Sequence, residues 1–462
     1  MKSPFRFIPL VVLAASAHAA THAVLPGASI QAKINLAVAG DIVAIFGGVY
    51  SEDITINKAI RLVEVNGHQV TLAGHITFSG VTNCPPLDGF TVNSPGRRIW
   101  VSNTTGLVLK NLDGRAGSGV HADGTSNLKI VNCQTTDVAV SGITSIVINE
   151  SQISNFTAGG PTAELTKTSV AGSVNHTGGD LTVATVTVAG NFDTQSAAQK
   201  TVAFRTIVSG DCNWRSKRNW FGYSEARSFN FIDQAQAKVV LVGNKIDRQG
   251  AEANGIYSNV SNSSILITNN RVVRVGYNHY QDFELGIDLR GGGNTAVIAN
   301  NYCQLQYYGY DGGVRGYGIS ISDFTQATII NNVIVGAKHG ISAPFGAFAA
   351  NNLYWASPWN AREANGVIAE ATLYTDPLFV ENEAPTLQPT SPCLNAGTPD
   401  PRYNNRDGSR NTIGPSGGPW IDPDGWTTEN PVVISFDLSP DMVLEGVDTE
   451  VILSEGQAVS AP

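Results

Sequence analysis

The chain has 462 residues, 48 of them glycine, and charged residues make up 15% of it against a usual value of about 25%. The apolar fraction of 42% excludes a disordered chain, and the glycine content excludes a coiled coil or a long helical bundle. Acidic residues number 38 and Lys plus Arg 29, for a net charge of −9, so we expect no nucleic-acid partner. A large, weakly charged, β-rich protein remains.

The first 19 residues have the pattern of a secretory signal peptide. Lys2 and Arg6 precede a short apolar run, and Ala17-His18-Ala19 supplies the small residues of a cleavage site. The apolar run is about half the ~20 residues that a membrane-spanning helix requires. We therefore expect an exported protein, secreted or at the cell surface, without a transmembrane segment.

Residues 20–425 are predicted to form one domain that begins with a capping helix. Ile30, Ile34 and Val38 recur at intervals of four residues, which predicts one apolar stripe on a short helix. Such a helix would cover strand edges that otherwise invite aggregation.

The middle of the chain repeats a unit in which a glycine opens one strand and an Asn-Asn pair closes the next. The pairs begin at residues 269, 300, 331 and 351, so they lie 31, 31 and 20 residues apart. Apolar residues alternate with a period of two, and β-branched residues dominate, which excludes helical repeats. Units of this kind predict a solenoid whose coils stack in parallel and bury their inward side chains.

Asparagine suits the end of each strand for two reasons. It tolerates the left-handed backbone conformation of a tight bend. Stacked on its equals in neighbouring coils, it can also hydrogen-bond along the stack. The 31-residue units exceed a minimal coil of about 22 residues, so we expect the extra residues in outward loops, where insertions of a solenoid carry function.

Three stretches resemble the bacterial right-handed parallel β-helix proteins of the pectate-lyase-like superfamily. They are residues 29–65, with the pattern GD-apolar-GxYxExIxIxK, the glycine and Asn-Asn units of 255–352, and the closing stretch 375–419. The resemblance implies an all-β, right-handed parallel β-helix from an exported bacterial protein. It implies an activity on polysaccharides only in general terms.

Residues 426–462 form a separate β tail. The alternating stretches VVISF and EVILS predict two or three strands, which resemble the start of an immunoglobulin-like module. Too few residues remain for a complete sandwich of about 100 residues. A docked strand pair and a truncated domain both stay open.

Two other features point to ordinary structure. Residues 244–247, Asn-Lys-Ile-Asp, are similar to a GTPase guanine-specificity segment, but the chain has no phosphate loop, so we expect no nucleotide. The five cysteines lack metal-ligand spacing. Cys133 and Cys303 lie in apolar strands and are interpreted as small core residues, and no disulfide pairing is assigned.

The candidate site lies on the outward surface of the central coils. Strand alternation places one outward residue two positions after each opening glycine, which predicts a column of His121, Thr144, Tyr257, Asp288, Ser320 and Ser342. The loops around 276–284 and 304–317 add aromatic and charged residues. Candidate substrate contacts are Tyr257, Arg290, Tyr307, Tyr308, Tyr310 and Tyr317.

These residue types suit a polysaccharide, and we expect an acidic one. We also expect the protein to be a monomer. β-Elimination from a uronate needs a cation for the carboxylate, either Ca²⁺ or an arginine, and a base for the C5 proton. The candidate bases are Lys338, His339 and Arg315, and the candidate Ca²⁺ ligands are Asp282, Glu284 and Asp288. Hydrolysis by two carboxyl groups is a weaker possibility.

Three interpretations of this surface stay open: an active site, a binding site without catalysis, and an inert surface in which Arg290 simply pairs with Asp288 or Glu284. The catalytic patterns of pectate lyases and polygalacturonases are missing, which favours a non-catalytic cell-surface or adhesion-type scaffold. The aromatic and charged loops at 276–317 favour a polysaccharide lyase, and we expect a carbohydrate-directed protein. A second aromatic and basic cluster at 212–223 is predicted to be a loop, with Trp214, Arg218 and Trp220 either gripping an acidic glycan or packing on the coils.

Overall fold

The structure is a computed structural model of the chain. It describes residues 19–65, 67, 69–93, 96, 98–114, 117–124, 126–248, 254–277, 284–307, 316–323, 325–356, 366–380, 386–421, 432–439 and 453–459. The predicted signal peptide thus lies almost wholly outside the described residues.

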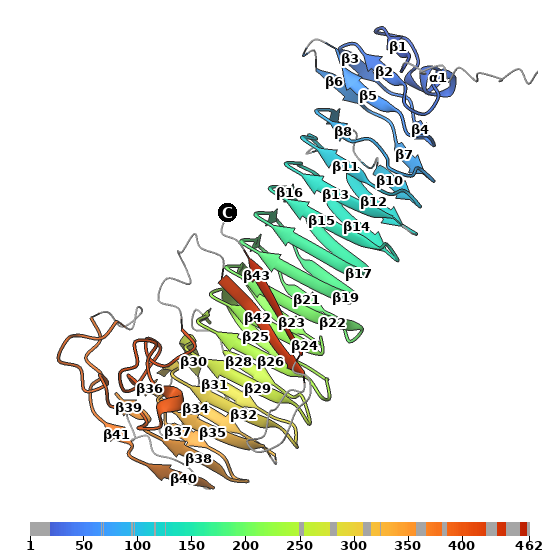
Figure 1. Ribbon diagram of the computed structural model, residues 1–462. Helices are drawn as coiled ribbons and strands as arrows, with labels where there is room; N and C mark the ends of the chain where they lie inside the picture. Colours follow the sequence, from blue (N-terminus) through green and yellow to red (C-terminus); the bar gives the residue numbers. More distant parts are fainter. Residues whose placement is uncertain are drawn as a thin grey trace, which may run out of the picture.

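Three parallel sheets run along a rod that has α1 (Ile30–Leu36) near one end and β40 near the other (Figure 1). Most coils contribute one strand to each sheet, and along the coils a strand pairs in parallel with its counterpart in the next coil. This register confirms the predicted parallel β-helix.

Sheet I carries the candidate site. Its strands are β4 (Ile54–Ile56), β7 (Ile76–Ser79), β10 (Arg98–Ser102), β12 (Gly119–Asp123), β14 (Asp137–Ser141), the first parts of β17 (Asn155–Thr166) and β19 (Val174–Ala184), β21 (Phe192–Thr194), the second parts of β23 (Ile207–Trp214) and β25 (Glu225–Phe231), β28 (Ile256–Ser258), β31 (Glu284–Leu289), β34 (Gly316–Ile321) and β37 (His339–Ser342).

Sheets II and III complete each coil. Sheet II holds β8 (Leu87–Asp88), β11 (Leu107–Lys110), β13 (Asn127–Val131), β15 (Ser145–Asn149), the second parts of β17 and β19, β22 (Ala198–Phe204), β24 (Arg218–Gly222), β26 (Lys238–Val242), β29 (Ser264–Thr268), β32 (Thr295–Ala299), β35 (Gln326–Ile330), β38 (Ala347–Ala350) and β40 (Val367–Glu370). Sheet III holds β3 (Gly48–Tyr50), β6 (Val70–Leu72), β9 (Thr91–Val92), β16 (Gln152–Ile153), β18 (Ser169–Val170), β20 (Thr187–Val188), the first parts of β23 and β25, β27 (Lys245–Asp247), β30 (Arg271–Tyr277), β33 (Tyr302–Tyr307), β36 (Val333–Val335), β39 (Leu353–Trp355) and β41 (Leu373–Tyr374).

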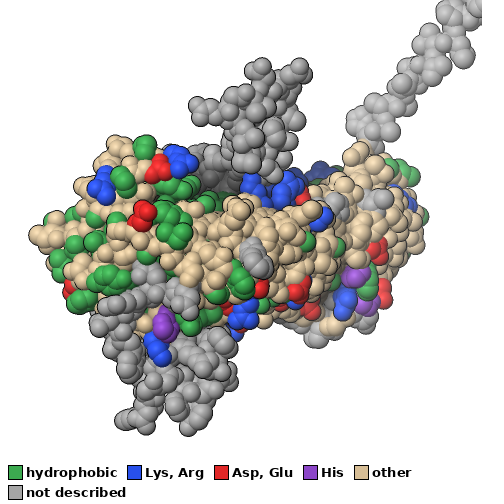
Figure 2. All heavy atoms as spheres, turned by 90° about the horizontal axis from the view of Figure 1, so that it is seen from below, with side chains coloured by type: hydrophobic (Ala, Val, Ile, Leu, Met, Phe, Trp, Pro, Cys, Tyr) green, Lys and Arg blue, Asp and Glu red, His purple; other side chains and the backbone are tan. Residues whose placement is uncertain are grey.

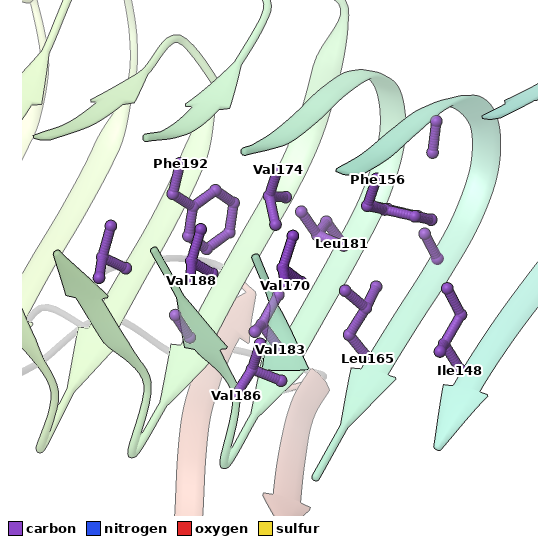
Figure 3. Close-up of a cluster of buried hydrophobic side chains, with 14 of the residues drawn as sticks. Ile148, Phe156, Leu165, Val170, Val174, Leu181, Val183, Val186, Val188 and Phe192 are labelled. Atoms are coloured by element: carbon purple, nitrogen blue, oxygen red, sulfur yellow. The ribbon is translucent and has the colours of Figure 1, made fainter. Parts of the chain in front are cut away.

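The core is a continuous apolar column inside the coils. Alternate residues of each strand point inward, so Phe156, Val174 and Phe192 stack from coil to coil, with Leu165 and Leu181 beside them (Figure 3). All five cysteines are buried and none forms a disulfide. This burial confirms the interpretation of Cys133 and Cys303 as small core residues.

The second asparagine of each pair forms a buried ladder. The side-chain amide of Asn270 donates to Oδ1 of Asn301 at 3.0 Å, Asn301 donates to Asn332 at 3.0 Å, and Asn332 donates to Asn352 at 3.0 Å. Asn244 extends the ladder by one coil, donating to Asn270 at 2.9 Å. The segment that is similar to a GTPase motif therefore begins with a ladder residue.

The first asparagine of each pair makes the bend and holds the closing segment (residues 386–421). Asn269, Asn300, Asn331 and Asn351 all have φ between 54° and 59°. The amide of Asn300 donates to the carbonyl oxygens of Thr412 and Gly414 at 2.8 and 3.0 Å, and the amide of Asn269 donates to that of Gly417 at 2.6 Å. The two predicted roles of asparagine are both present, but each belongs to a different member of the pair.

Helix α1 is seven residues long, and its start is held by the carboxylate of Glu52. That carboxylate accepts from the backbone N–H of Ile30 at 2.5 Å and from the Ser29 hydroxyl at 2.7 Å. Ile30 and Ile34 are buried, as predicted, but Val38 is 65% exposed. The predicted stripe is wrong at Val38 because the helix ends two residues earlier.

The remaining elements lie at the chain ends. β1 (Thr21–Val24), β2 (Ile42–Ile45) and β5 (Arg61–Glu64) form a parallel sheet beside α1, and a 3₁₀ turn spans Pro401–Tyr403. In the tail, β42 (Val432–Ser439) and β43 (Leu453–Val459) pair antiparallel, and β42 lies beside β22 and β24 (Figure 1). None of the described helices could span a membrane.

Uncharged side chains and backbone cover most of the face drawn in Figure 2, with charged side chains scattered among them. This distribution follows from the coil geometry, because inward positions need apolar residues and bends need glycine or asparagine. Charged side chains are therefore few and lie at outward positions, so a group of them is a stronger indication of a functional site than on an ordinary protein surface.

Replacing Asn301 with alanine should destabilise the fold by about 3–5 kcal/mol, because buried partners lose their bonds. The Asn301 amide donates to the carbonyl oxygens of Ile267 and Ala299, and its Oδ1 accepts from both nitrogens of Asn270. Denaturant unfolding measures the change. As a control, Asn127→Ala removes one exposed bond, to the N–H of Gly106, and should cost about 1 kcal/mol or less. Equal losses in the two variants would contradict a special role for the ladder.

His176 should contribute less to the stability of the protein in mild acid than at neutral pH. This side chain is fully buried, and neither ring nitrogen has a hydrogen-bond partner among the described residues. Burial lowers the pKa of His176 to about 4 from its usual 6.5. The unfolded chain therefore binds the proton more readily, and about 3 kcal/mol of stability is lost as the pH falls from about 6.5 to 4. The free energy of unfolding of the wild type relative to that of His176→Leu should fall by this amount between pH 6.5 and 4, and a difference that does not change with pH would contradict this cause.

Candidate functional site

A single outward column runs along sheet I. The strand register aligns, in order, Trp100, His121, Ala139, Thr157, Asn175, Asp193, Asn213, Asn230, Tyr257, Asp288, Ser320 and Ser342. The predicted placement is confirmed for all but one residue of the column. Thr144 is wrong, because Gly142 has φ 64° and lies in a turn, and Ala139 takes the place in the column.

Asp288 is the centre of the charged part of this column. It is 1% exposed, and its carboxylate accepts from Nε of Arg290 at 2.9 Å and from the Asn254 amide at 3.1 Å. The guanidinium carbon of Arg290 lies 5.4 Å from the centre of the Tyr257 ring. The interpretation that Arg290 pairs with Asp288 is confirmed, and it leaves Arg290 exposed beside an aromatic face.

The electrostatics of Asp288 are unusual for a carboxyl group on an outer face. Burial raises its pKa to about 6, although Arg290 and Asn254 act in the opposite direction. A displaced pKa of this kind, on a surface built of polar and aromatic groups, is typical of a functional site. Asp288 fixes the position of Arg290, and Arg290 is the group that a ligand would meet.

The predicted Ca²⁺ ligands are only partly described. Asp282 and the side chain of Glu284 lie outside the described residues. Asp288 accepts its bonds from a guanidinium and an amide, which an ion at this carboxylate would have to displace. Within the described part of the chain, no group of three or more His, Cys, Asp or Glu side chains gathers in one place. Calcium binding stays a prediction.

His339 is stacked on Tyr317 in the adjacent coil. The ring centres are 4.7 Å apart and the planes differ by 22°. Burial, followed by the charge of Lys338, lowers the pKa of His339, so the imidazole is neutral at pH 7 and can accept a proton. Arg315, the third candidate base, lies outside the described residues.

The structure does not bring His339 and Asp288 together. Their strands are two coils apart, and His339 precedes the member of the column in its own strand, Ser342, by three residues. At a coil spacing of about 4.8 Å and a rise of about 3.3 Å per residue, their backbones are separated by about 14 Å. His339 and the Arg290–Asp288 pair therefore lie at separate backbone positions on sheet I.

Of the other candidate tyrosines, only the backbone of Tyr307 is described. The backbone of Tyr307 lies in β33, paired with that of Tyr277 in β30, while Tyr308 and Tyr310 are outside the described residues. Their predicted contacts with a substrate remain predictions.

The prediction for the 212–223 cluster is wrong for Trp214. Its side chain is 1% exposed and packs against Phe192, Phe221 and Phe231 in the core. The segment is not a loop, because β23 and β24 continue the coils in register. Trp220 packs beside Phe204, Tyr223 and Ile421, and Arg218 lies exposed at the start of β24. The alternative of tryptophans packed on the coils is correct.

Sequence reasoning missed two features of sheet I. The first is an ion cluster in which the Asp211 carboxylate accepts from Arg227, from Arg248 at 3.2 Å and from the Ser228 hydroxyl at 2.6 Å. Burial of Asp211 is outweighed by the bonds from Arg227 and Ser228, which lower its pKa. These residues are 16 to 37 positions apart in an irregular repeat, so no spacing signal marks them.

The second missed feature is a groove on the strands nearer the N-terminus. It has a volume of about 580 Å³ and is lined by residues of β10, β12, β14, β17 and β19, among them Arg98, Asp137, Asn155, Thr157 and Asn175. A signal was present, since a tryptophan at position 100 stands at an outward position of an alternating strand.

Comparison with known proteins adds to this description. No protein-family model matches the chain, and no curated protein matches it in sequence. The chain is similar to PfbA, a surface adhesin of Streptococcus pneumoniae, with 10% identity over 77% of this chain and 93% of that one and a TM-score of 0.26.

Two enzymes are similar at the same level. The pectate lyase Pel9A has 13% identity over 84% of this chain and 90% of that one, with a TM-score of 0.24. The alginate lyase AlyF-OU02 has 13% identity over 78% and 88%, with a TM-score of 0.24. The assignment of the fold rests on the strand register of the chain itself.

Asp288→Asn should stabilise the protein at neutral pH. A carboxyl group whose pKa is raised from 3.8 to about 6 contributes full stability when protonated, below about pH 4, and loses it as the pH rises through 6. The neutral amide should therefore gain up to about 3 kcal/mol in unfolding measured at pH 7.5 and nothing at pH 4. The control is Asp400→Asn, which should not stabilise, because Arg402 lowers the pKa of Asp400. Destabilisation of Asp288→Asn at pH 7.5 would contradict the assignment.

Proposed function

We propose that this protein is a carbohydrate-directed β-helix protein that binds an acidic polysaccharide along the outward column of sheet I. The observation that carries the proposal is the arrangement at Arg290, whose guanidinium is held by a buried carboxylate and lies over the Tyr257 ring. An arginine offers paired donors to a carboxylate, and an aromatic face covers the apolar face of a sugar ring. The two groups stand side by side at one point on an extended outer surface.

Binding is favoured over turnover by the separation of the chemical groups. A lyase needs a cation at the uronate carboxylate and a base at C5 of the same sugar. The neutral base His339 lies about 14 Å from Asp288, as estimated from coil spacing. The described residues thus supply the cation and the base at different subsites.

A polysaccharide lyase acting on acidic glycans is the second candidate. It is favoured by His339, which is neutral, partly buried and stacked on Tyr317. In such a reaction the base removes the C5 proton, the electron pair forms a C4–C5 double bond, and the glycosidic C4–O bond breaks as the leaving oxygen takes a proton. Lys338 and Arg315 are the other candidate bases, and Ca²⁺ is the alternative to Arg290 at the carboxylate.

The test of binding compares two arginines that make the same local ion pair. Arg290 and Arg402 each donate through Nε to the aspartate two residues earlier, but Arg402 lies outside sheet I, in the closing segment. Calorimetric titration with polygalacturonate and alginate should show at least about tenfold weaker binding for Arg290→Ala. Arg402→Ala should bind like the wild type. Equal affinity of all three proteins for every polyuronate would contradict the proposed site.

The same panel decides whether the protein cleaves what it binds. Ultraviolet absorbance of the unsaturated product is followed with and without Ca²⁺, and after chelation. If product forms, His339→Ala, Lys338→Ala or Arg315→Ala should abolish it while binding persists. Binding without product on any substrate leaves the scaffold function and refutes the lyase.

A further inference from the structure

The groove on β10, β12, β14, β17 and β19 lies away from the Arg290 site on the same sheet. Three glycines, at positions 96, 117 and 119, contribute to its lining without side chains. At Gly119 a Cβ atom would lie 3.0 Å from the Asp137 carbonyl oxygen, so a larger residue would crowd the floor. The groove is therefore open because the sequence leaves out side chains at its base.

Its walls combine the groups that recognise a sugar. Asn155 donates to the Asp137 carboxylate at 2.9 Å. Thr157, which follows Ala139 in the outward column, is exposed. At the N-terminal side, the Trp100 and His121 rings lie 4.4 Å apart, and the Arg98 guanidinium is 5.8 Å from the Trp100 ring. Arg98 and several uncharged polar groups line the hollow, and the Trp100 and His121 pair lies in β10 and β12, whose other residues contribute to the lining.

Two polar atoms in this region have no partner among the described residues. They are Oδ1 of Asn175, which lines the groove, and Nδ1 of His121 in the same column. Both atoms are buried, and a buried polar atom without a partner costs free energy unless something supplies the bond.

The outward column links the groove to the Arg290 site. Asn175 is followed in register by Asp193, Asn213 and Asn230, and the last of these precedes Tyr257. Asn213 donates to the Asp193 carboxylate at 2.7 Å, and Asn230 donates to Asn213 at 2.8 Å. Six coil steps separate Thr157 from Asp288, which is about 30 Å along the axis.

We infer that the groove is a second saccharide-binding site, which holds the same acidic polysaccharide chain at a distance of about 30 Å from Arg290. The inference rests on the proposed function for the identity of the polymer. Arg98 is placed to meet a uronate carboxylate, and the Trp100 ring to cover a sugar face. Two linked sites on one chain give an affinity above that of either site alone, and an oligomer too short to bridge them loses that gain.

The experiment changes charge at one exposed groove position. Thr157→Glu should weaken binding of long-chain polygalacturonate or alginate about tenfold, because it repels the polymer. Thr157→Lys, a variant of similar length and opposite charge, should bind as tightly as the wild type or more tightly. Binding of uronate trisaccharides at the Arg290 site should be the same in both. Thr328→Glu, an identical substitution at an outward position of sheet II, is the control and should have no effect.

Trp100→Ala tests the aromatic group that neighbours the groove in β10, with Trp355→Ala as its match. Trp355 is 41% exposed on sheet III and should be neutral. Trp100→Ala should weaken long-chain binding about tenfold and leave trisaccharide binding unchanged. Because Trp100 also packs on His121, thermal unfolding is measured alongside, and Thr157→Glu decides the question if Trp100→Ala does not fold.

The outcomes separate the two proposals. Long-chain binding that is unchanged in both Thr157→Glu and Trp100→Ala overturns the second site, as does equal weakening by Thr157→Glu and Thr157→Lys. Loss of binding in Thr157→Glu with none in Arg290→Ala supports the groove and refutes the Arg290 site. A wild-type protein that binds neither long-chain polymer overturns both.

Discussion

Stacking of one coil on the next at strand spacing is the constraint on which this molecule depends. Every backbone group of a strand is paired with the coil above and below, so any residue that disturbs the spacing is felt along the stack. The asparagine ladder matches this spacing with a side chain, since each amide from Asn270 to Asn332 reaches the next at 3.0 Å. It occupies the corner where the chain turns, which is where backbone pairing alone is weakest.

The same regularity creates the functional face. Once coils are in register, outward residues from segments far apart in sequence fall into one line, as Trp100, Asn175 and Asp288 do. Polar groups then recur at the coil spacing without any loop having to place them. The proposed polysaccharide ligand matches such a line in shape, because it too repeats along one axis.

Much of the architecture could be predicted from sequence because it repeats. The Asn-Asn pairs marked the bends, and strand alternation placed Tyr257, Asp288, Ser320 and Ser342 correctly. Thr144 was misplaced because Gly142 opens a turn, and a glycine read alone does not distinguish a strand start from a left-handed bend. Trp214 was misplaced for a different reason. Its basic neighbours suggested a loop, although Cys212 and Trp214 have the spacing of two inward residues in one strand.

The chemistry of the candidate site was harder to predict from the sequence. The pKa of Asp288 depends on burial beneath Arg290 and on Asn254, a residue 34 positions away, and neither is visible in the local sequence. Gly117 and Gly119 line the groove without side chains, and no sequence motif predicts this position for them. The Asp211 cluster joins residues from three coils of unequal length. Such features follow from three-dimensional register, and a sequence of irregular period does not specify that register.

The hydrogen bonds between the closing segment and the first asparagine of each pair affect the order in which the chain folds. Each coil can form as soon as its neighbour exists, so most of the solenoid needs only contacts between nearby parts of the chain. The amides of Asn269 and Asn300 are different, because their acceptors are residues 411–417, more than a hundred positions later. Until that stretch arrives, these amides can bond only to water. The bonds that fix the closing segment to the coils therefore form last, after the C-terminal part of the chain is present.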